Sequence, residues 1–323
     1  MIIVWRITER CNLSCPFCRY DRRLRWVRRD MPTQKVLAFG KILSDYQHQT
    51  KDRVLVSWLG GEPFLWKPLL RVSKIFRENL RLNVSVTTNG SLLLHRHIRL
   101  QSFDALSEIT ISVDGFAEFH NVKRGFKNGF QHLKRCVQWM SRRKNRIGSG
   151  PKLRANILLM RENIGDFAPL CCELAAWGIE EITFNQLGGN DRPDYFISHR
   201  LLPHQIEKLK LELPFIRTQL WSAGVRLQGG PAYIRRMEAS ASDQRIGIHD
   251  CEPGERFLFI NERGYASPCS FTINEYGVPI DEIYSVNDLF NIRGRFQTLR
   301  IMKKAGSCDD CHSTQVFEKF VNS

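Results

Sequence analysis

The amino-acid sequence predicts an α/β fold whose main part is an open, partial (βα)6 barrel. Apolar, β-branched runs alternate with segments of helical pattern from residue 2 to residue 223. Six such strand–helix units follow one another, which favours parallel strands joined by right-handed crossovers. Because a closed barrel of this kind needs eight units, six units predict a barrel that stays open. The alternation stops near residue 224, so a smaller second module is expected after it.

The expected elements share the lengths and residue types of their class. The strands are short runs rich in Val, Ile and Thr, and they are expected at 2–7, 54–59, 84–88, 108–113, 153–159 and 181–186. The helices carry apolar residues every three or four positions, and they are expected at 32–46, 67–79, 95–102, 129–142, 163–177 and 203–223. The segment from Gly188 to Tyr195 is expected to be a loop after the sixth strand.

The second module begins with glycine and proline at 229–231, which are read as a break in the chain. Residues 257–261 and 265–271 are expected to form a hairpin, because Asn and Gly occupy the turn between them. The sequence therefore predicts two domains, residues 1–224 and 225–323.

Composition limits the classes of protein that fit. No apolar run approaches the roughly 20 residues that span a bilayer, and the apolar start of the chain is too short for a signal peptide. A cytoplasmic protein without a membrane partner is therefore expected. The net charge of +15 indicates an anionic partner such as a nucleic acid, a phosphate or a carboxylate, or else a solvated basic surface.

Seven of the ten cysteines are grouped in the sequence. Cys11, Cys15 and Cys18 lie within eight residues directly after the first strand. Iron–sulfur clusters take thiolate ligands, usually four, so three close thiolates would leave one iron open for chemistry. A structural zinc site prefers four ligands, and no fourth Cys or His lies nearby in the sequence. The spacing therefore favours an iron–sulfur cluster over zinc.

The pattern Cys11-x3-Cys15-x2-Cys18, with Phe17 before the last cysteine, resembles the signature of the radical S-adenosylmethionine (radical SAM) family. Gly60-Gly-Glu-Pro63 after the second strand resembles the GGEP motif of that family, and the resemblance covers residues 1–220. It implies a partial (βα)6 barrel and a [4Fe-4S] cluster on the three cysteines. It also implies that S-adenosylmethionine binds the open iron and is cleaved to a 5′-deoxyadenosyl radical, which abstracts a substrate hydrogen.

The resemblance implies a set of cofactor contacts at the carboxyl ends of the strands, where open parallel sheets bind ligands. They are Phe17, Gly60, Gly61, Glu62, Pro63, Thr88, Asn89, Ser112, Asp114, Arg124 and Asn156. Glu62 would meet the cofactor amine, although alone it is typical of a helix start. Arg124 would bind the cofactor carboxylate or else lie on the surface. Asn156 is polar in mid-strand and needs a partner, for which a bound ligand is one candidate.

The late cysteines Cys251, Cys269, Cys308 and Cys311 resemble the truncated SPASM module called Twitch. The resemblance implies one auxiliary [4Fe-4S] cluster with four protein ligands, in a hairpin-plus-helix module; a four-thiolate zinc site is the alternative. A second cluster could accept an electron from a substrate radical, which favours net oxidation. Epimerisation stays open through Cys171 or Cys172 as a hydrogen donor, although their apolar helix favours buried structural thiols.

The substrate is less clearly marked. A basic run with one aromatic residue follows the cluster loop and is read as an anionic-substrate clamp, an RNA contact or a solvated loop; its members are Arg22, Arg23, Arg25, Trp26, Arg28 and Arg29. Asp191 or Asp194 is a candidate general base for the proton lost on oxidation, or a solubilising loop residue.

Three substrate hypotheses follow. The first is oxidative modification of a ribosomal peptide, by cross-linking or dehydrogenation. A first strand at residue 2 leaves no room for a peptide-recognition domain ahead of it, which counts against this hypothesis. The second is oxidation or epimerisation of a sugar or aminocyclitol intermediate. The third, ranked last, is an RNA-binding or RNA-modifying iron–sulfur protein. A reducing partner such as flavodoxin or ferredoxin is expected for the radical chemistry.

Overall fold

One ten-stranded sheet organises the chain, in the order β10-β9-β8-β1-β2-β3-β4-β5-β6-β7. The computed structural model describes residues 1–189, 191–317 and 319. The strands are β1 (Ile2–Thr8), β2 (Leu55–Gly60), β3 (Asn83–Thr88), β4 (Glu108–Ser112), β5 (Lys152–Leu159), β6 (Glu181–Gln186), β7 (Arg226–Leu227), β8 (Phe257–Ile260), β9 (Tyr265–Ser267) and β10 (Val278–Pro279). The six expected strands all form and pair in parallel, which confirms the open α/β barrel.

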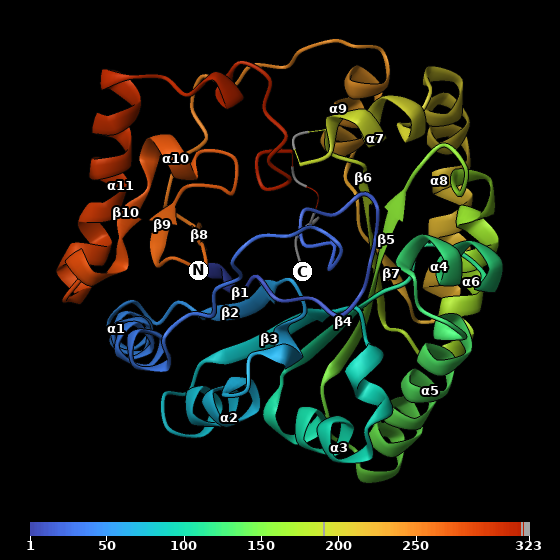
Figure 1. The fold of residues 1–323 in the computed structure, drawn as a ribbon, viewed down its shortest axis with the longest axis horizontal. Helices are drawn as coiled ribbons and strands as arrows, with labels where there is room; N and C mark the ends of the chain where they lie inside the picture. Colours follow the sequence, from blue (N-terminus) through green and yellow to red (C-terminus); the bar gives the residue numbers. More distant parts are fainter. Residues whose placement is uncertain (190, 318, 320–323) are drawn as a thin grey trace.

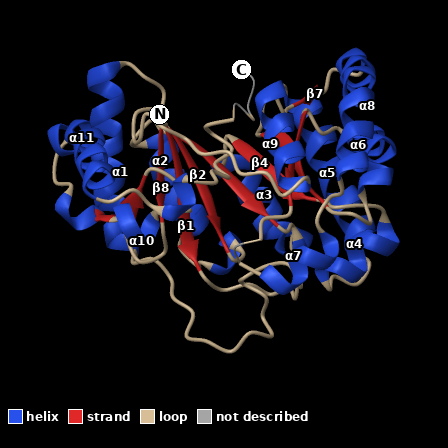
Figure 2. Cartoon of the chain, turned by 90° about the horizontal axis from the view of Figure 1, so that it is seen from above, coloured by secondary structure: helices blue, strands red, loops and turns tan. Residues whose placement is uncertain are grey.

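The helices cover the outer face of the curved sheet, and the loop after β1 crosses its inner side (Figures 1 and 2). They are α1 (Thr33–Thr50), α2 (Leu69–Glu78), α3 (Arg96–Ala105), α4 (Ala117–Arg124), α5 (Gly129–Ile147), α6 (Phe167–Trp177), α7 (Pro193–His199), α8 (Pro203–Ser222), α9 (Pro231–Ala241), α10 (Ile273–Tyr276) and α11 (Val286–Met302). In the described part of the chain, none of these helices is long and apolar enough to cross a membrane.

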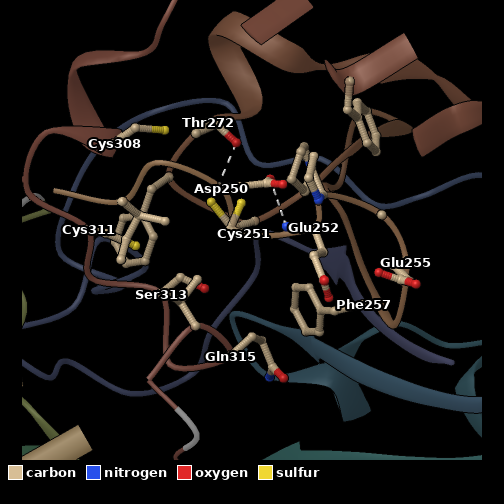
Figure 3. A pocket seen from close by; sticks show the side chains of 18 of the residues that line it. Asp250, Cys251, Glu252, Glu255, Phe257, Thr272, Cys308, Cys311, Ser313 and Gln315 are labelled. Atoms are coloured by element: carbon tan, nitrogen blue, oxygen red, sulfur yellow. Dashed lines mark hydrogen bonds between the residues drawn. The ribbon is translucent and has the colours of Figure 1, made fainter. Parts of the chain in front are cut away.

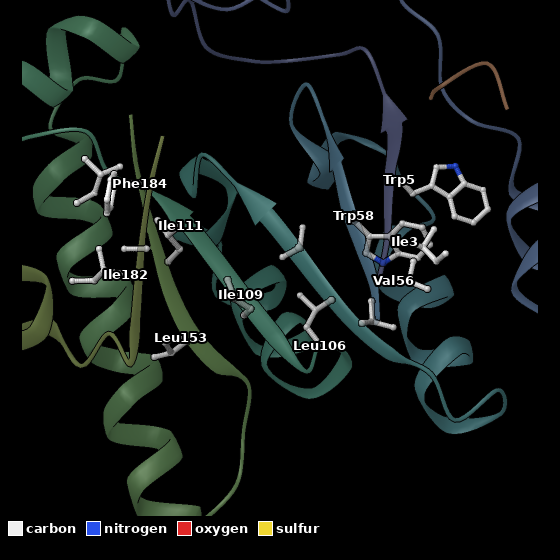
Figure 4. Close-up of a cluster of buried hydrophobic side chains, with 14 of the residues drawn as sticks. Ile3, Trp5, Val56, Trp58, Leu106, Ile109, Ile111, Leu153, Ile182 and Phe184 are labelled. Carbon is white, nitrogen blue, oxygen red and sulfur yellow. The ribbon is translucent and has the colours of Figure 1, made fainter. Parts of the chain in front are cut away.

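The core lies between the strands and the outer helices, and it follows from the alternation of side chains along each strand. In β1, Ile3, Trp5 and Ile7 are fully buried, and Figure 4 shows Ile3 and Trp5 among the core side chains. Trp5 meets Phe39 of α1 edge to face, with ring centroids 5.6 Å apart. The residues between them, including Arg6, are only partly buried and belong to the opposite face, which is the inner face of the barrel. The inner face is therefore free to carry polar side chains.

The C-terminal part of the chain extends the same sheet. β8 pairs in parallel with β1, from Ile2 with Phe257 to Trp5 with Ile260. The expected hairpin is present as β8 and β9, although its second strand ends at Ser267. Residue 224, the expected domain boundary, lies between α8 and β7.

Two helices occupy segments that were expected to be irregular. α7 begins at Pro193 in the expected loop after β6, and α9 begins at Pro231 in the expected break. In both helices proline is the first helical residue, where its missing N–H costs nothing and its fixed φ suits the helix. The prolines that were read as breaks are therefore helix starts.

Candidate active site

The cysteine triad lies on a loop that leaves the carboxyl end of β1. The loop turns tightly, since the Cys18 N–H donates to the Cys15 carbonyl at 3.1 Å and the Asp21 N–H donates to the Cys18 carbonyl at 3.2 Å. Burial raises the pKa of Cys11 to about 11 and that of Cys15 to about 12. A buried thiol of this kind ionises when a metal supplies positive charge, so the triad suits a metal cluster.

Two glycines let the end of β2 touch this loop. A Cβ atom on Gly61 would lie 2.1 Å from the Arg10 carbonyl oxygen, and one on Gly60 would lie 2.4 Å from the Thr8 carbonyl oxygen. Gly60 also has a φ of 149°, a backbone angle that residues with a side chain rarely adopt. The Glu62 N–H then donates to the Arg10 carbonyl at 2.7 Å. The glycines of the GGEP motif therefore fix the cluster loop against β2.

Glu62 is fully buried and joins three parts of the site. Its Oε1 accepts from Thr88 Oγ1 at 2.7 Å and from the Phe64 N–H at 3.2 Å, and its Oε2 accepts from the Asn89 N–H at 2.8 Å. Asn89 Nδ2 in turn donates to the Cys11 sulfur at 3.9 Å. Burial raises the pKa of Glu62 to about 7. Glu62 therefore caps a short helix and also lies beside the cysteine triad.

Arg124 reaches the same loop from the end of α4. It donates two hydrogen bonds to Asp114, which is fully buried, and its carbonyl accepts from the Cys15 thiol at 3.9 Å. Its guanidinium lies 5.7 Å from the centre of the Phe17 ring. The Leu158 N–H donates to Asp114 at 3.0 Å, so Asp114 is held in place by β5. The expected contacts Phe17, Asp114 and Arg124 are thus together.

His120 also belongs to this group, although the sequence did not single it out as a site residue. Its Nδ1 accepts from the Asp114 N–H at 3.3 Å, and its side chain is fully buried. Burial and the charge of Arg124 lower the pKa of His120 to about 4, so its imidazole is neutral. The only sequence signal for it is its position one helical turn before Arg124.

Asn156 finds partners within the protein. Its Oδ1 accepts from Thr183 Oγ1 and from Asn185 Nδ2, each at 2.9 Å. Asn156 pairs in register with Ser112 across β4 and β5, so both expected contacts lie at the same edge of the sheet. The need of Asn156 for a partner is therefore met without a ligand.

The two candidate bases lie on the segment after β6, which contacts the cluster loop through Asp191 and Tyr195. Asp191 Oδ1 lies 3.8 Å from Arg19 Nη1, and both side chains are about half exposed. Asp194 lies in the first turn of α7, whose Tyr195 ring is 6.3 Å from that of Phe17.

The basic run is divided between two roles. Arg28 donates to four backbone carbonyls of the cluster loop region, and Arg23 forms an ion pair with Asp21 at 2.6 Å. These two arginines hold the loop together. The other three arginines of the run are exposed and form none of these contacts, namely Arg22, Arg25 and Arg29.

The four late cysteines line one cavity of about 770 Å³ (Figure 3). Arg300 Nη1 lies 3.7 Å from the sulfur of Cys251, and the Cys269 sulfur lies 3.4 Å from Thr272 Oγ1. Burial raises the pKa of Cys311 to about 11. Across residues 1–189, 191–317 and 319, no three Cys, His, Asp or Glu side chains are placed to hold a single metal ion. The cavity also touches Ile2 of β1, so it adjoins the barrel.

The remaining cysteines lie away from both groups. Cys171 is fully buried in the hydrophobic core on α6, and Cys136 on α5 donates to the Leu93 carbonyl at 3.5 Å. Both agree with structural thiols. Cys172 is partly buried next to Cys171.

Comparison with known proteins agrees with this geometry. Residues 5–171, more than half of the 323, match the Radical SAM superfamily. The AdoMet-dependent heme synthase of Nitratidesulfovibrio vulgaris is 21% identical over 338 residues, which cover 98% of this chain and 85% of that protein. The sporulation killing factor maturation protein SkfB of Bacillus subtilis is 28% identical over 136 residues, 42% of this chain and 32% of that protein.

A comparison of folds finds solved structures with a similar architecture. The structure of Streptococcus suis SuiB bound to precursor peptide SuiA has a TM-score of 0.64 and 16% identity, and covers 98% of this chain and 75% of that chain. The cysteine triad and the GGEP motif around the carboxyl end of β1 thus belong to a chain whose sequence matches one family over more than half of its length. This protein belongs to the radical SAM superfamily, whose enzymes use a [4Fe-4S] cluster and S-adenosylmethionine.

Proposed function

We propose that the protein oxidises a ribosomal peptide by radical SAM chemistry, and that it holds two [4Fe-4S] clusters. The observation that carries this proposal is the cavity lined by Cys251, Cys269, Cys308 and Cys311, which adjoins the barrel. Four thiolates can ligate every iron of a cubane cluster, so a cluster in this cavity would have no iron left for the cofactor.

The donor set of the first site fits a cluster with one open iron. Cys11, Cys15 and Cys18 share one loop, and all three thiols have raised pKa values because they are buried. In this proposal Glu62 binds the amino group of S-adenosylmethionine. Arg124, oriented by Asp114, binds its carboxylate.

The size of the cavity at the second site supports a cluster over zinc. A zinc ion bound by four cysteines is closely surrounded by their sulfurs, at about 2.3 Å each. Here four cysteines line a cavity of about 770 Å³, which has room for a cubane cluster. Arg300, next to Cys251, would offset part of the negative charge of the thiolates.

When bound, these groups supply the radical that removes a substrate hydrogen atom and a second centre for the electron left on the substrate. The residues of the chain bind, orient and move protons around that chemistry. Asp191 and Asp194 are the proposed acceptors of the proton released on oxidation, because both lie on the segment that faces the cluster loop. The proposed electron donor is a flavodoxin or ferredoxin.

The match to SkfB supports a peptide as substrate. A heme precursor is the second candidate, because the heme synthase of N. vulgaris matches 98% of this chain, far more than SkfB does. A sugar or aminocyclitol is the remaining alternative.

The test is product analysis by mass spectrometry with the anaerobically reconstituted enzyme. It uses precursor peptides encoded beside the gene and, in parallel, carboxylated heme precursors. A peptide two hydrogens lighter, or cross-linked, supports the proposal. Conversion of the heme precursor alone would establish the second candidate. A peptide of unchanged oxidation level that gains one deuterium from heavy water would show epimerisation and refute the oxidation.

Variants separate the two metal sites. The double variant Cys308→Ala/Cys311→Ala should still form 5′-deoxyadenosine but no product, provided that it is soluble and keeps the first cluster. Cys171→Ala is the control, because Cys171 is buried in the core away from both groups of clustered cysteines. This variant should form the same product as the wild type. Full product formation by the double variant would contradict a role for the second site in oxidation.

A further inference from the structure

Arg6 lies on the inner face of the barrel, between two aromatic rings. The alternation along β1 places it opposite the buried Trp5 and Ile7. Its guanidinium carbon is 4.9 Å from the ring centre of Phe259 in β8 and 5.8 Å from that of Tyr20. Phe259 and Tyr20 are both almost completely buried. Aromatic stacking of this kind holds a guanidinium plane in position and leaves its N–H edge available.

The guanidinium of Arg6 differs in its polar contacts from other arginines of the interior. Among the residues that the structure describes, none accepts a hydrogen bond from it and no carboxylate lies within ion-pair distance. Other arginines of the interior are paired, as Arg124 is with Asp114 and Arg236 is with Asp310. The N–H groups of Arg6 are therefore available to bind a ligand.

Two more polar atoms near Arg6 lack partners. Within the described part of the chain, neither the Tyr20 hydroxyl nor Glu262 Oε2 has a hydrogen-bond partner, although Tyr20 is 4% and Glu262 6% exposed. Burial raises the pKa of Tyr20. The positive charge of Arg6 lowers this pKa and the negative charge of Glu262 raises it, so both side chains lie within electrostatic range of the Tyr20 hydroxyl. Burial and a side-chain hydrogen bond with Glu262 raise the pKa of Glu9, so the carboxyl group of Glu9 contacts that of Glu262 on the side of the cluster loop. Each unpaired buried group costs roughly 1–3 kcal/mol, so two of them beside the guanidinium of Arg6 indicate a binding site.

We propose that Arg6, Tyr20 and Glu262 bind a substrate carboxylate that has an N–H or O–H donor one or two bonds away. The guanidinium and the Tyr20 hydroxyl donate to the carboxylate, and Glu262 Oε2 accepts from the neighbouring donor. Arg6 supplies the bidentate geometry that carboxylates favour. This inference rests on the proposed function, because it takes the barrel as the place where the substrate binds.

The position of the three residues fits this role. Tyr20 follows Cys18 by two residues, and Arg6 lies within electrostatic range of Cys18. Glu262 lies in the turn between β8 and β9, and that hairpin leads to Cys269. A carboxylate bound here lies between the segments that carry the two cysteine groups. A peptide offers the required pair of groups, since its last amide N–H lies two bonds from the terminal carboxylate carbon.

Four small probes test the site on the reconstituted holoenzyme. They are N-acetylglycine, which has the carboxylate and the donor; acetate, which lacks the donor; N-acetylglycinamide, which lacks the carboxylate; and inorganic phosphate. Binding is measured as the ligand-induced rise in Tm over a concentration series at constant ionic strength. N-acetylglycine should bind the wild type more tightly than acetate, and N-acetylglycinamide should not bind. Arg6-dependent binding of phosphate that is tighter than that of N-acetylglycine would overturn the carboxylate assignment.

Two variants and one control connect the binding to Arg6. Arg6→Gln should weaken N-acetylglycine binding about tenfold or more, since a charge-assisted hydrogen bond is lost. Arg6→Lys keeps the positive charge but loses the planar pair of N–H donors, so its affinity for N-acetylglycine should be intermediate. If Arg6→Gln does not fold, Arg6→Lys is the variant that tests the site. Arg71→Gln is the control, because Arg71 is exposed on α2 and belongs to neither the cluster loop nor the proposed site, and it should bind like the wild type. Equal binding by the wild type and by the Arg6 variants overturns the inference.

Failure of the carboxylate site and failure of the proposed peptide oxidation give different results. The probes contain no radical-accepting peptide, and their binding is read without turnover. If no peptide is oxidised while N-acetylglycine binds through Arg6, then the peptide oxidation fails and the carboxylate site stands. If peptides are oxidised at the same KM by the wild type and by Arg6→Lys, and the probes do not bind, then the site fails and the oxidation stands.

Discussion

Arg124 donates from Nε to Asp114 Oδ2 at 2.7 Å and from Nη2 to Asp114 Oδ1 at 2.9 Å, and both residues are buried. The two are ten residues apart, and α4 brings the chain back so that Arg124 lies against the end of β4. The Arg124 carbonyl also accepts from the Cys15 thiol. The pair therefore links the strand end, α4 and the cluster loop.

Asp114→Ala should destabilise the protein by about 3–5 kcal/mol, because it leaves a buried guanidinium without its counter-charge. The free energy of unfolding is measured by anaerobic urea denaturation. The double variant Asp114→Ala/Arg124→Met should be more stable than Asp114→Ala alone, since it removes the unpaired charge. Lys208→Ala, which breaks an exposed pair with Glu212, should change stability little. If Asp114→Ala is no worse than Lys208→Ala, the pair does not stabilise the fold.

Glu62 should make the stability of the cofactor-free protein depend on pH. Burial raises its pKa from 4.5 to about 7, so the folded protein binds this proton more tightly than the unfolded chain does. The stabilisation is complete below the unfolded pKa and is lost as pH rises through about 7, by up to roughly 3 kcal/mol. Urea denaturation between pH 5 and 8 should show this slope in the wild type and a smaller one in Glu62→Gln. Equal slopes in both proteins would show that Glu62 does not cause it.

Glu62→Gln should also weaken binding of S-adenosylmethionine about tenfold or more, because a charge-assisted hydrogen bond to the cofactor amine is lost. Binding is measured by equilibrium dialysis of the reconstituted protein, and the iron content should equal that of the wild type. Unchanged affinity would leave Glu62 with the role that its hydrogen bond to the Phe64 N–H already shows, the start of a short helix.

The sequence was sufficient for the barrel because each strand of the parallel part is a short β-branched run and each crossover helix has apolar residues at helical spacing. It was also sufficient to predict that Glu62, Thr88 and Asn89 lie close together, because the carboxyl ends of parallel strands are on the same side of the sheet. The pairing of Arg124 with Asp114 was not predictable, because it depends on the turn that α4 makes after β4. The parallel pairing of β8 with β1 joins residues about 250 positions apart, and no local pattern reports such a contact. The site at Arg6 was missed for the same reason, since Phe259 and Glu262 come from that distant hairpin.

Iron content should distinguish the two cysteine groups. The reconstituted wild type should hold about eight irons, four for each cubane cluster. Changing Cys11, Cys15 and Cys18 together to Ala should leave about four irons and abolish cleavage of S-adenosylmethionine. Iron and zinc are measured by elemental analysis, with Cys171→Ala as a control that should keep the wild-type iron content. Stoichiometric zinc at the late cysteines, without a second cluster by Mössbauer spectroscopy, would contradict the auxiliary cluster.

Gly61→Ala should disturb the first cluster site from the side of β2. Its Cβ would lie 2.1 Å from the Arg10 carbonyl oxygen, which is backbone and has no room to rotate away, so the cluster loop must move. Overpacking of this kind costs about 1–3 kcal/mol, and the displaced loop should lower the iron content toward that of the triad variant.

Gly294→Ala is the matched control, since Gly294 is exposed within α11 and a Cβ there would touch nothing within 4 Å. That change should stabilise the protein by about 0.5–1 kcal/mol, because Ala loses less backbone entropy than Gly in a helix. Iron content and urea denaturation measured on both variants test the argument. Wild-type iron and stability in Gly61→Ala would show that the contact with Arg10 is not needed to hold the cluster loop.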